Sequence, residues 1–228
     1  MAVAAPKTRR GESSRAAILG AALELFQERG YEATTMRAIA DGVGVSLGSS
    51  YHYFPTKEHL VLEFYRHTHE LHAAAIAPLL ARERDFATRL RGTIRAVVVT
   101  CEPFHDFAGS IFSTVANPAS PLNPFGAAAR PLRDEVVALY AEVVNGSDAR
   151  IPADIAAMLP LVLWLYQMGI LYFWIFDQSP GRLRTLEVID ETTDLIVKLL
   201  SLANLPLLRG SRRRILGLIQ SVAEGQAL

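Results

Sequence analysis

Gly30, Gly44 and Pro55 divide the first quarter of the chain into short segments, each with the periodicity of a helix. Between Ser13 and Arg29, apolar residues recur every three or four positions, as they do along the buried face of a helix. A glycine readily adopts the left-handed backbone that ends many helices, and a proline lacks the amide hydrogen that would continue one. The sequence therefore predicts a group of short, tightly packed helices before residue 60.

Hydroxyl side chains stand where the next helices should begin, because a Ser or Thr oxygen accepts a hydrogen bond from an unpaired amide of the first turn. Ala40 and Gly44 supply a small side chain and a tight turn between two of these helices, as a steep helix crossing requires. Ile39, Val45 and Phe54 then hold the pair against the first helix. This is the helix-turn-helix arrangement, whose second helix lies in the major groove of DNA. The expected caps are Thr34 or Thr35, Ser46 and Thr56, ahead of helices running to about Gly42, to about Phe54, and onward from Lys57.

Residues 13–62 resemble the DNA-binding domain of the TetR family of bacterial repressors. The order and spacing of the matching pieces agree throughout, so the resemblance is far more specific than a lone helix-turn-helix match. Leu47 stands where a polar or charged residue is frequent in the family, and Ser50 where an apolar one is. The first departure leaves the base preference open, and the second predicts slightly looser packing of the recognition helix. The matching pieces are Ile18 to Phe26, Gly30 to Thr35, Ile39-Ala40, Gly44 to Ser46, and Tyr51 to Leu60.

The resemblance also implies which residues contact DNA. Small residues at the start of the third helix let its N-terminus approach the groove, where amide groups and the helix dipole favour a phosphate. Contacts from the preceding helix and from flanking residues would position the DNA backbone without reading its sequence. A helical hairpin that packs on something other than DNA is the alternative for this segment. The implied residues are Thr35, Arg37, Ser46, Gly48, Ser49, Tyr51, His52 and Lys57.

Composition extends the helical prediction to the rest of the chain. Of the 228 residues, 50% are hydrophobic, and Ala, Leu, Glu and Arg, which favour helices, are abundant. The chain is expected to be all-α. A three-helix DNA-binding domain with a basic N-terminal arm is expected over residues 1–60, and a larger all-helical effector-binding and dimerisation domain over residues 61–228. Besides a proline-rich loop from Asn117 to Pro131, helices are expected near 57–76, 85–102, 104–116, 131–145, 153–177, 182–203 and 207–222.

One late segment, Leu159–Phe176, is almost wholly apolar and close to the roughly 20 residues that a bilayer span needs. Pro160 and the central Gln167 argue against a span, so burial in a helical bundle or a dimer is expected instead. The family resemblance implies that two late helices pair with their copies, and the segments near 153–177 and 182–203 fit that role. Such a homodimer presents two recognition helices about 34–36 Å apart to a palindromic operator.

An effector cavity among the middle helices is also implied by the resemblance. Aromatic and flexible apolar residues recur there with few polar groups, the usual lining of a site for a small, largely hydrophobic ligand. For each residue taken singly, an ordinary place in the core is the alternative. Gln167 is the sharpest candidate, because a buried amide needs partners, either the effector or the same residue of a second copy. The candidates are Tyr65, His69, Arg95, Phe104, His105, Phe112, Trp164, Gln167, Met168 and Tyr172.

Other function classes find little support in the sequence. There is no phosphate-binding loop and no nucleophile elbow, so neither an enzyme nor a cofactor is expected. His67, His69 and His72 form a metal-like cluster, but their spacing suits a polar helix face or pocket lining better than a zinc site, so no metal is expected. Lys and Arg balance Asp and Glu at 23 each, which argues against a protein that coats DNA through its net charge.

The sequence thus predicts a cytoplasmic, ligand-responsive repressor that a small hydrophobic effector releases from its operator. The lone Cys101 permits no disulfide within the chain, fits a reducing compartment and is expected to be a buried, unreactive thiol. The alternatives are an activator of the same family, an enzyme with its site among the histidines, and a membrane-anchored interaction protein. Lys7, Arg9 and Arg10 suggest a supplementary DNA contact, and Arg209–Arg214 a solvated helix face. The effector, the operator and the regulated genes are not specified by the sequence.

Overall fold

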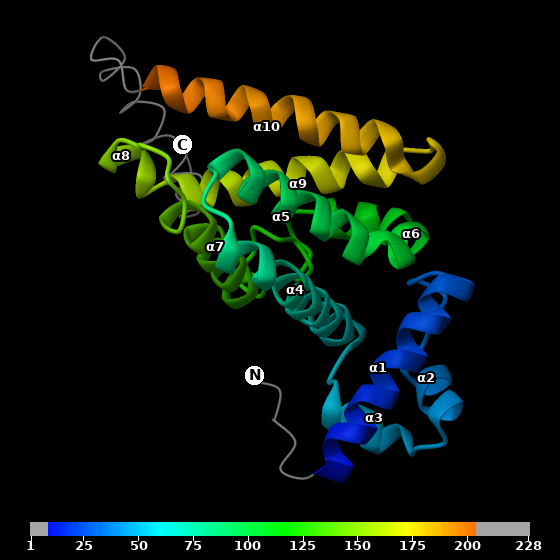
Figure 1. The fold of residues 1–228 in the computed structure, drawn as a ribbon. Coiled ribbons are helices and arrows are strands. Elements are labelled where there is room, and N and C mark those ends of the chain that lie inside the picture. The colour runs from blue at the N-terminus through cyan, green and yellow to red at the C-terminus, as the bar shows by residue number, and fades with distance from the viewer. Residues whose placement is uncertain (1–8, 204–228) are drawn as a thin grey trace. The chain divides into compact units, whose positions relative to one another are not determined.

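The computed structural model describes residues 9–203, and its regular structure over that range is entirely helical, which confirms the all-α expectation (Figure 1). The side chains of the basic arm, at Lys7, Arg9 and Arg10, lie outside what the structure describes. So do the Arg209–Arg214 cluster and the helix expected near 207–222.

By their internal contacts, the described residues form two compact units. The head unit combines the residues up to Thr68 with Pro103–Ala129. The body unit combines His69–Glu102 with the residues from Arg130 onward. The functional boundary expected after residue 60 stays a prediction, but the packing places a later segment of the chain with the N-terminal helices.

The first part of the head unit is built from α1 (Arg9–Arg29), α2 (Met36–Val43), α3 (Leu47–Tyr53) and the first turns of α4 (Lys57–Arg82). Gly30 and Gly44 adopt positive φ angles of 81° and 70°, and they follow α1 and α2 as expected. Apolar side chains from these helices and from the segments between them meet in one core. These are Ile18, Ala22, Phe26, Tyr31, Met36, Ile39, Phe54, Leu60, Val61 and Phe64.

A later helix, α6 (His105–Ala116), completes this core. It follows the 3-10 helix η1 (Glu102–Phe104) and buries Phe107 and Ile111 among the residues of the first helices. The Phe107 ring stacks on the ring of Phe26, with centroids 5.4 Å apart and planes inclined by 7°. The loop after α6 is folded into consecutive hydrogen-bonded turns, and its Leu122 is fully buried in the same core. The head therefore depends on two stretches of chain that are far apart in sequence.

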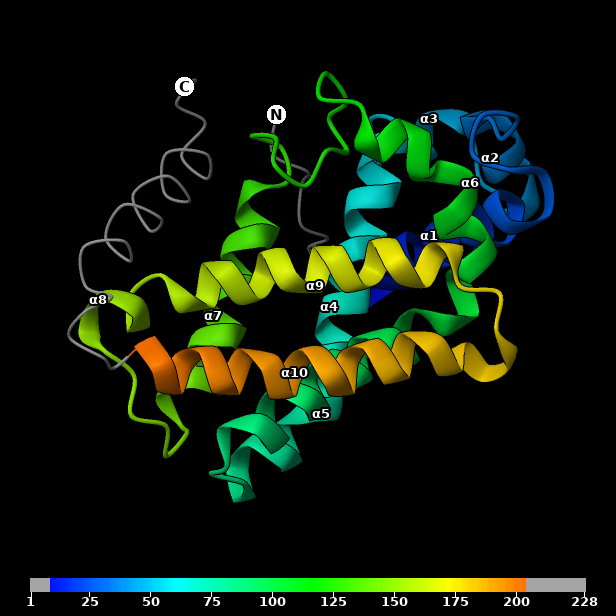
Figure 2. The ribbon, with the colours of Figure 1, turned by 90° about the horizontal axis from the view of Figure 1, so that it is seen from above.

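The body unit is built from the rest of α4, α5 (Phe86–Cys101), α7 (Arg130–Asn145), α8 (Ala153–Ala156), α9 (Leu159–Phe176), η2 (Pro180–Arg182) and α10 (Leu183–Ala203). α9 packs against α7 and α10, and α10 packs against α5; Figure 2 shows α9 and α10 running side by side. The connection between them is fixed by Asp177, which accepts hydrogen bonds from the Thr185 amide at 2.9 Å and hydroxyl at 2.7 Å. Burial by itself would raise the pKa of Asp177, but hydrogen bonds from Ser179 and Thr185 hold it well below its usual range.

Three helices differ in extent from the sequence prediction, and the first of them, α1, begins at Arg9 rather than near Ser13. The single helix expected near 153–177 is split into α8 and α9, because Pro160 has no amide hydrogen and its ring obstructs the carbonyl four residues earlier. α4 was expected to end near residue 76, but it continues through Pro78 to Arg82. Leu79 and Leu80, which are half-buried, extend its packed face beyond that point.

Arg89 joins the ends of two helices inside the body unit. Its side chain is only 2% exposed, and it donates four hydrogen bonds to backbone carbonyl oxygens. Nη1 donates to Leu80 and Glu83, at the end of α4, at 2.7 Å each. Nε donates to Val143 at 2.9 Å and Nη2 to Glu142 at 2.6 Å, near the end of α7. One cation thereby satisfies three carbonyls that the helix ends leave unpaired and shares the Glu142 carbonyl with the Gly146 amide. It also faces the negative ends of two helix dipoles.

Replacing Arg89 with methionine should destabilise the protein strongly, because the carbonyls of Leu80, Glu83 and Val143 would lose their donor, at about 1–3 kcal/mol for each group left unsatisfied. We expect a loss of at least about 3 kcal/mol, measured by thermal and urea unfolding at matched protein concentration. Arg91→Met is the control, since Arg91 makes exposed ion pairs that contribute about 1 kcal/mol or less. Equal effects of the two substitutions would contradict the assigned role.

Candidate DNA-binding surface and effector region

The turn between α2 and α3 is fixed by hydrogen bonds from its own residues. Thr35 caps α2, with its hydroxyl accepting from the Ala38 amide at 3.1 Å. The Val45 amide donates to the Ala40 carbonyl at 3.0 Å, across the left-handed Gly44. Ser46 caps α3 in the same way as Thr35 caps α2. These contacts confirm the expected helix-turn-helix, and Figure 1 shows α2 and α3 next to each other beside α1.

The residues that the resemblance implies for DNA contact lie on or next to these two helices. Thr35, Ser46 and Lys57 stand at helix starts, Arg37 lies in α2, and the others lie in α3. Two of the set, Ser49 and Lys57, are half-buried. The exposed members are Thr35, Arg37, Ser46, Gly48, Tyr51 and His52.

Gly48, in the first turn of α3, has no structural need to be glycine. Its φ is not positive, and a β-carbon built on it would meet no atom within 4 Å. Glycine in a helix costs roughly 1 kcal/mol relative to alanine. The absent side chain instead leaves the backbone at the start of α3 open to close approach from outside.

Two basic side chains near this surface are engaged inside the head unit. The Lys57 ammonium donates to the Tyr31 carbonyl at 2.8 Å and lies 4.4 Å from the centre of the Tyr31 ring. Arg15 forms an ion pair with Glu63, and its guanidinium lies 5.1 Å from the centre of the Phe54 ring. Both cations therefore tie the N-terminal helices together, a role that sequence spacing does not signal. A phosphate contact by Lys57 stays a prediction.

Ser50 is buried beneath the recognition helix. Its side chain is 0% exposed, and its hydroxyl has no hydrogen-bond partner in the described structure. A buried hydroxyl without a partner is destabilising. The departure from the family pattern at this position thus has a physical cost inside the head unit.

Four of the effector candidates belong to the head unit, and two of them pack against its core. The Phe104 ring meets the Phe64 ring edge-on, with centroids 4.7 Å apart. Tyr65 also packs against the head core, and its ring centroid lies 5.9 Å from that of Phe64. His105 is buried, and Phe112 is half-buried.

The other six candidates belong to the body unit, where they lie in different environments. Gln167 is buried and accepts a hydrogen bond of 2.7 Å from the Tyr140 hydroxyl, so this amide has a partner within its own chain. Trp164 is buried beside the Arg133 guanidinium, at 5.7 Å. His69 and Met168 are half-buried, and Tyr172 is 54% exposed.

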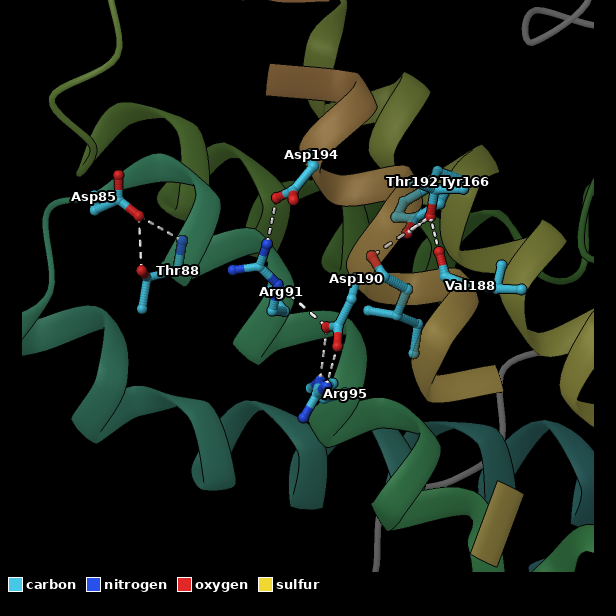
Figure 3. Close-up of polar contacts among 10 residues, drawn as sticks. Asp85, Thr88, Arg91, Arg95, Tyr166, Val188, Asp190, Thr192 and Asp194 are labelled. Carbon is cyan, nitrogen blue, oxygen red and sulfur yellow. Dashed lines mark hydrogen bonds and ion pairs between the residues drawn. The ribbon is translucent and has the colours of Figure 1, made fainter. Parts of the chain in front are cut away.

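Arg95, the sixth, lies in a ladder of charges between α5 and α10 (Figure 3). Its Nε donates to Asp190 at 3.2 Å, and Arg91 bridges Asp190 and Asp194 on the next turns. Binding of an anionic effector group by Arg95 would have to compete with Asp190.

Within residues 9–203, no three His, Cys, Asp or Glu side chains are grouped so that they could hold a metal ion. The Nε2 atom of His72, one of the three histidines of the metal-like cluster, lies 2.9 Å from the Thr93 carbonyl oxygen.

A cavity of about 300 Å³ lies elsewhere in the body unit. It is formed by the start of α5, the segment 148–151 and the end of α10. None of the predicted effector residues lines it, and sequence periodicity did not indicate it because loop residues supply much of its wall. Its lining includes Asp85, Phe86, Asp148, Arg150, Ile151 and Leu200.

Cys101, at the end of α5, has an enclosed thiol. Burial, with a smaller effect from Glu102, raises the pKa of Cys101 to about 12. Since the thiolate is the reactive form, the thiol is inert at neutral pH.

Two family models match the chain. Residues 18–64 match the family described as bacterial regulatory proteins, tetR family. Residues 89–210, more than half of the chain, match the tetracyclin repressor-like C-terminal domain. The chain belongs to the TetR family. This places it among regulatory proteins rather than enzymes.

Individual proteins agree with this assignment. The HTH-type transcriptional repressor KstR2 of Mycobacterium tuberculosis is 38% identical over 100 residues, which cover 41% of this chain and 46% of KstR2. The chain thus spans about half the length of this curated relative. A putative TetR-family regulator from Syntrophomonas wolfei has a TM-score of 0.65 at 20% identity, over 82% of this chain and 95% of that one. FadR of Thermus thermophilus, solved with lauroyl-CoA, has a TM-score of 0.58 at 24% identity, over 78% of this chain and 92% of that one. The two solved structures show the shared fold.

Ser50→Ala should stabilise the head unit by about 1 kcal/mol, because it removes a buried hydroxyl that has no partner and because alanine favours a helix more than serine does. Thermal unfolding at matched concentration measures the effect. Ser49→Ala is the control, since Ser49 is half-buried on the same helix and its substitution should change stability by less than about 0.5 kcal/mol. A lower stability for Ser50→Ala would show that the hydroxyl is satisfied in solution.

Proposed function

We propose that this protein is a cytoplasmic transcriptional repressor that binds palindromic operator DNA as a homodimer and is released by a small, largely hydrophobic effector. The observation that carries the proposal is the capped helix-turn-helix with an exposed α3. Membership of a family of regulatory proteins supports it.

DNA reading is assigned to α3 and its flanks. Its exposed Gly48, Tyr51 and His52 combine open backbone, a hydroxyl and an imidazole on a helix short enough to enter a major groove. Thr35, which caps α2, and Arg37, which lies on it, are exposed where they could contact adjacent phosphates, and such contacts position the helix without specifying bases. We assign sequence recognition to α3 and positioning to the other residues.

Homodimerisation is assigned to the outer faces of α9 and α10. Within residues 9–203, α9 is the one helix long and apolar enough to cross a membrane by length and composition, a test that the core helices of many soluble proteins also pass. Its inner face is buried on α7 and α10, while the outer faces of α9 and α10 expose an apolar surface. A second copy covers that surface in the proposed dimer. The exposed residues are Tyr172, Phe173, Phe176, Leu183, Leu195, Leu199 and Leu202.

The effector acts by binding one conformation of the dimer better than the other, because a ligand shifts a balance only by its differential affinity. The structural neighbour FadR binds lauroyl-CoA, which supports an acyl chain as the hydrophobic part of the effector. α4 is the proposed lever, since its first turns lie in the head unit and its last turns in the body unit. α6 adds a second route, because a shift of Phe107 would disturb the core beneath the reading surface.

Selection of bound sequences from random duplex DNA tests the proposal. We expect enrichment of a palindrome with half-sites about one helical turn apart, and an affinity that falls steeply with salt. Saturating lauroyl-CoA should weaken binding to the selected operator at least about tenfold, whereas CoA alone should not; a tenfold change corresponds to about 1.4 kcal/mol. If a broad panel of acyl-CoAs and fatty acids leaves operator affinity unchanged, the assigned effector class is wrong. No enriched sequence would reject operator reading itself.

Gly48→Ala separates DNA recognition from stability. The added methyl group should stabilise α3 by up to about 1 kcal/mol and yet reduce operator affinity at least about tenfold, because it occupies space that DNA needs. Gly20→Ala is the matched control: Gly20 is also exposed within a helix with no atom within 4 Å of its missing β-carbon. It should gain stability and keep its affinity. Unchanged affinity in Gly48→Ala would remove the assigned role of the glycine.

A further inference from the structure

We propose that the two protomers of the homodimer cross at Gly169, where α9 of one copy packs directly against α9 of the other. The inference rests on the proposed homodimer and goes beyond it by assigning the point on the interface that lies at the twofold axis. It concerns a single residue in the middle of α9 and the side chains on the same face.

Gly169 has no role inside its own protomer that requires glycine. It is exposed in the middle of an eighteen-residue helix, its φ is not positive, and a β-carbon there would meet nothing within 4 Å. Because glycine at a helix interior costs roughly 1 kcal/mol relative to alanine, the packing within one chain would favour a side chain here. Any requirement for glycine at this position therefore has to come from outside the protomer.

Large apolar side chains surround this gap on the outer face of α9. Tyr172, Phe173 and Phe176 follow Gly169 at helical spacing and are 54%, 39% and 59% exposed. Leu165, one turn before it, is half-buried. The gap is thus a notch in an apolar ridge, and α9 carries no charged residue along its length. A partner helix that is also narrow and apolar at this point can approach the notch closely.

A second copy of α9 is the partner that fits. In a twofold dimer, a residue on the axis meets its own counterpart, so the side chain at that point has to share its space with an identical one. Helix axes lie 8–10 Å apart depending on the side chains at the contact, and glycine permits the closest approach. The notch therefore allows the ridges of two copies to cross, while the aromatic residues on each side supply apolar area to bury. A flat lipid surface or a flexible ligand would gain nothing from a gap at this one position.

Positions along α10 show which residues would lie far from a twofold axis at Gly169. The Tyr166 hydroxyl lies 2.6 Å from the Thr192 hydroxyl, which sets the register of the two antiparallel helices one turn before Gly169. Leu202 lies ten residues beyond Thr192, about 15 Å farther along α10 and on the side away from Gly169. The two copies of Leu202 should therefore be far apart in a dimer centred on Gly169, although Leu202 is 53% exposed on the same apolar surface.

Cysteine cross-linking tests the crossing directly. In a Cys101→Ala background, Gly169→Cys should form a covalent dimer rapidly under mild oxidation, because a disulfide needs Cα atoms within about 7 Å. Leu202→Cys in the same background is the matched control and should remain largely uncross-linked. Efficient cross-linking of Leu202→Cys with none for Gly169→Cys would place the axis elsewhere and overturn the inference.

A steric variant gives an independent readout in the uncross-linked protein. Gly169→Leu should raise the dimer dissociation constant at least about 30-fold in sedimentation equilibrium, because two added side chains would meet at the axis. Gly20→Leu, which adds the same side chain at another exposed helical glycine, should leave it unchanged. Circular dichroism should show full helicity in both, since leucine favours a helix over glycine.

The outcomes separate this inference from the proposed function. A dimer that keeps its affinity in Gly169→Leu and does not cross-link through Gly169→Cys overturns the crossing point while leaving the homodimer intact. A wild-type protein that stays monomeric at all concentrations, with or without operator DNA, rejects the homodimer and the inference together.

Discussion

The stacking of Phe107 on Phe26 is the contact on which the head unit depends. Three helices and the start of a fourth enclose too little apolar volume to form a stable domain with ease, because small domains bury a smaller share of their surface. α6 and Leu122 supply the missing part of that core from a later stretch of the chain. The proposed DNA-reading surface therefore lies on a core that two separate segments of the chain supply, and a change in the later segment is felt beneath that surface.

Local features of the head could be predicted from sequence because neighbouring residues determine them. Thr35 and Ser46 cap the helices that follow them, and Gly44 adopts the left-handed conformation that the turn requires. Each of these depends on a few adjacent positions and on backbone chemistry alone. The fold class followed from the same periodicity, repeated along the chain. The break before α9 was missed, although Pro160 carried the signal, since the apolar composition on both sides suggested one continuous helix.

Long-range contacts could not be predicted in this way. Nothing in the spacing of residues shows that Arg89 reaches the end of α7 or that Arg95 pairs with Asp190. The effector candidates illustrate the same limit, because aromatic residues at helical spacing line cores and pockets alike. Tyr65 and Phe104 pack on the head core, and Gln167 is paired with Tyr140. Polar partners within the protein account for part of what sequence reasoning assigned to a ligand.

The two ends of α4 differ in mechanical character. Its last turn is held by hydrogen bonds from Arg89, and just before it Pro78 offers no amide to the carbonyl of Ala74. Helices bend most easily at such a point, because the hydrogen bond that would resist bending is missing. From Lys57 to about Ala74 the helix keeps its full backbone ladder. α4 is therefore a stiff rod with its compliance concentrated in a short segment at one end, so a displacement applied there is carried along the rest of its length with little loss.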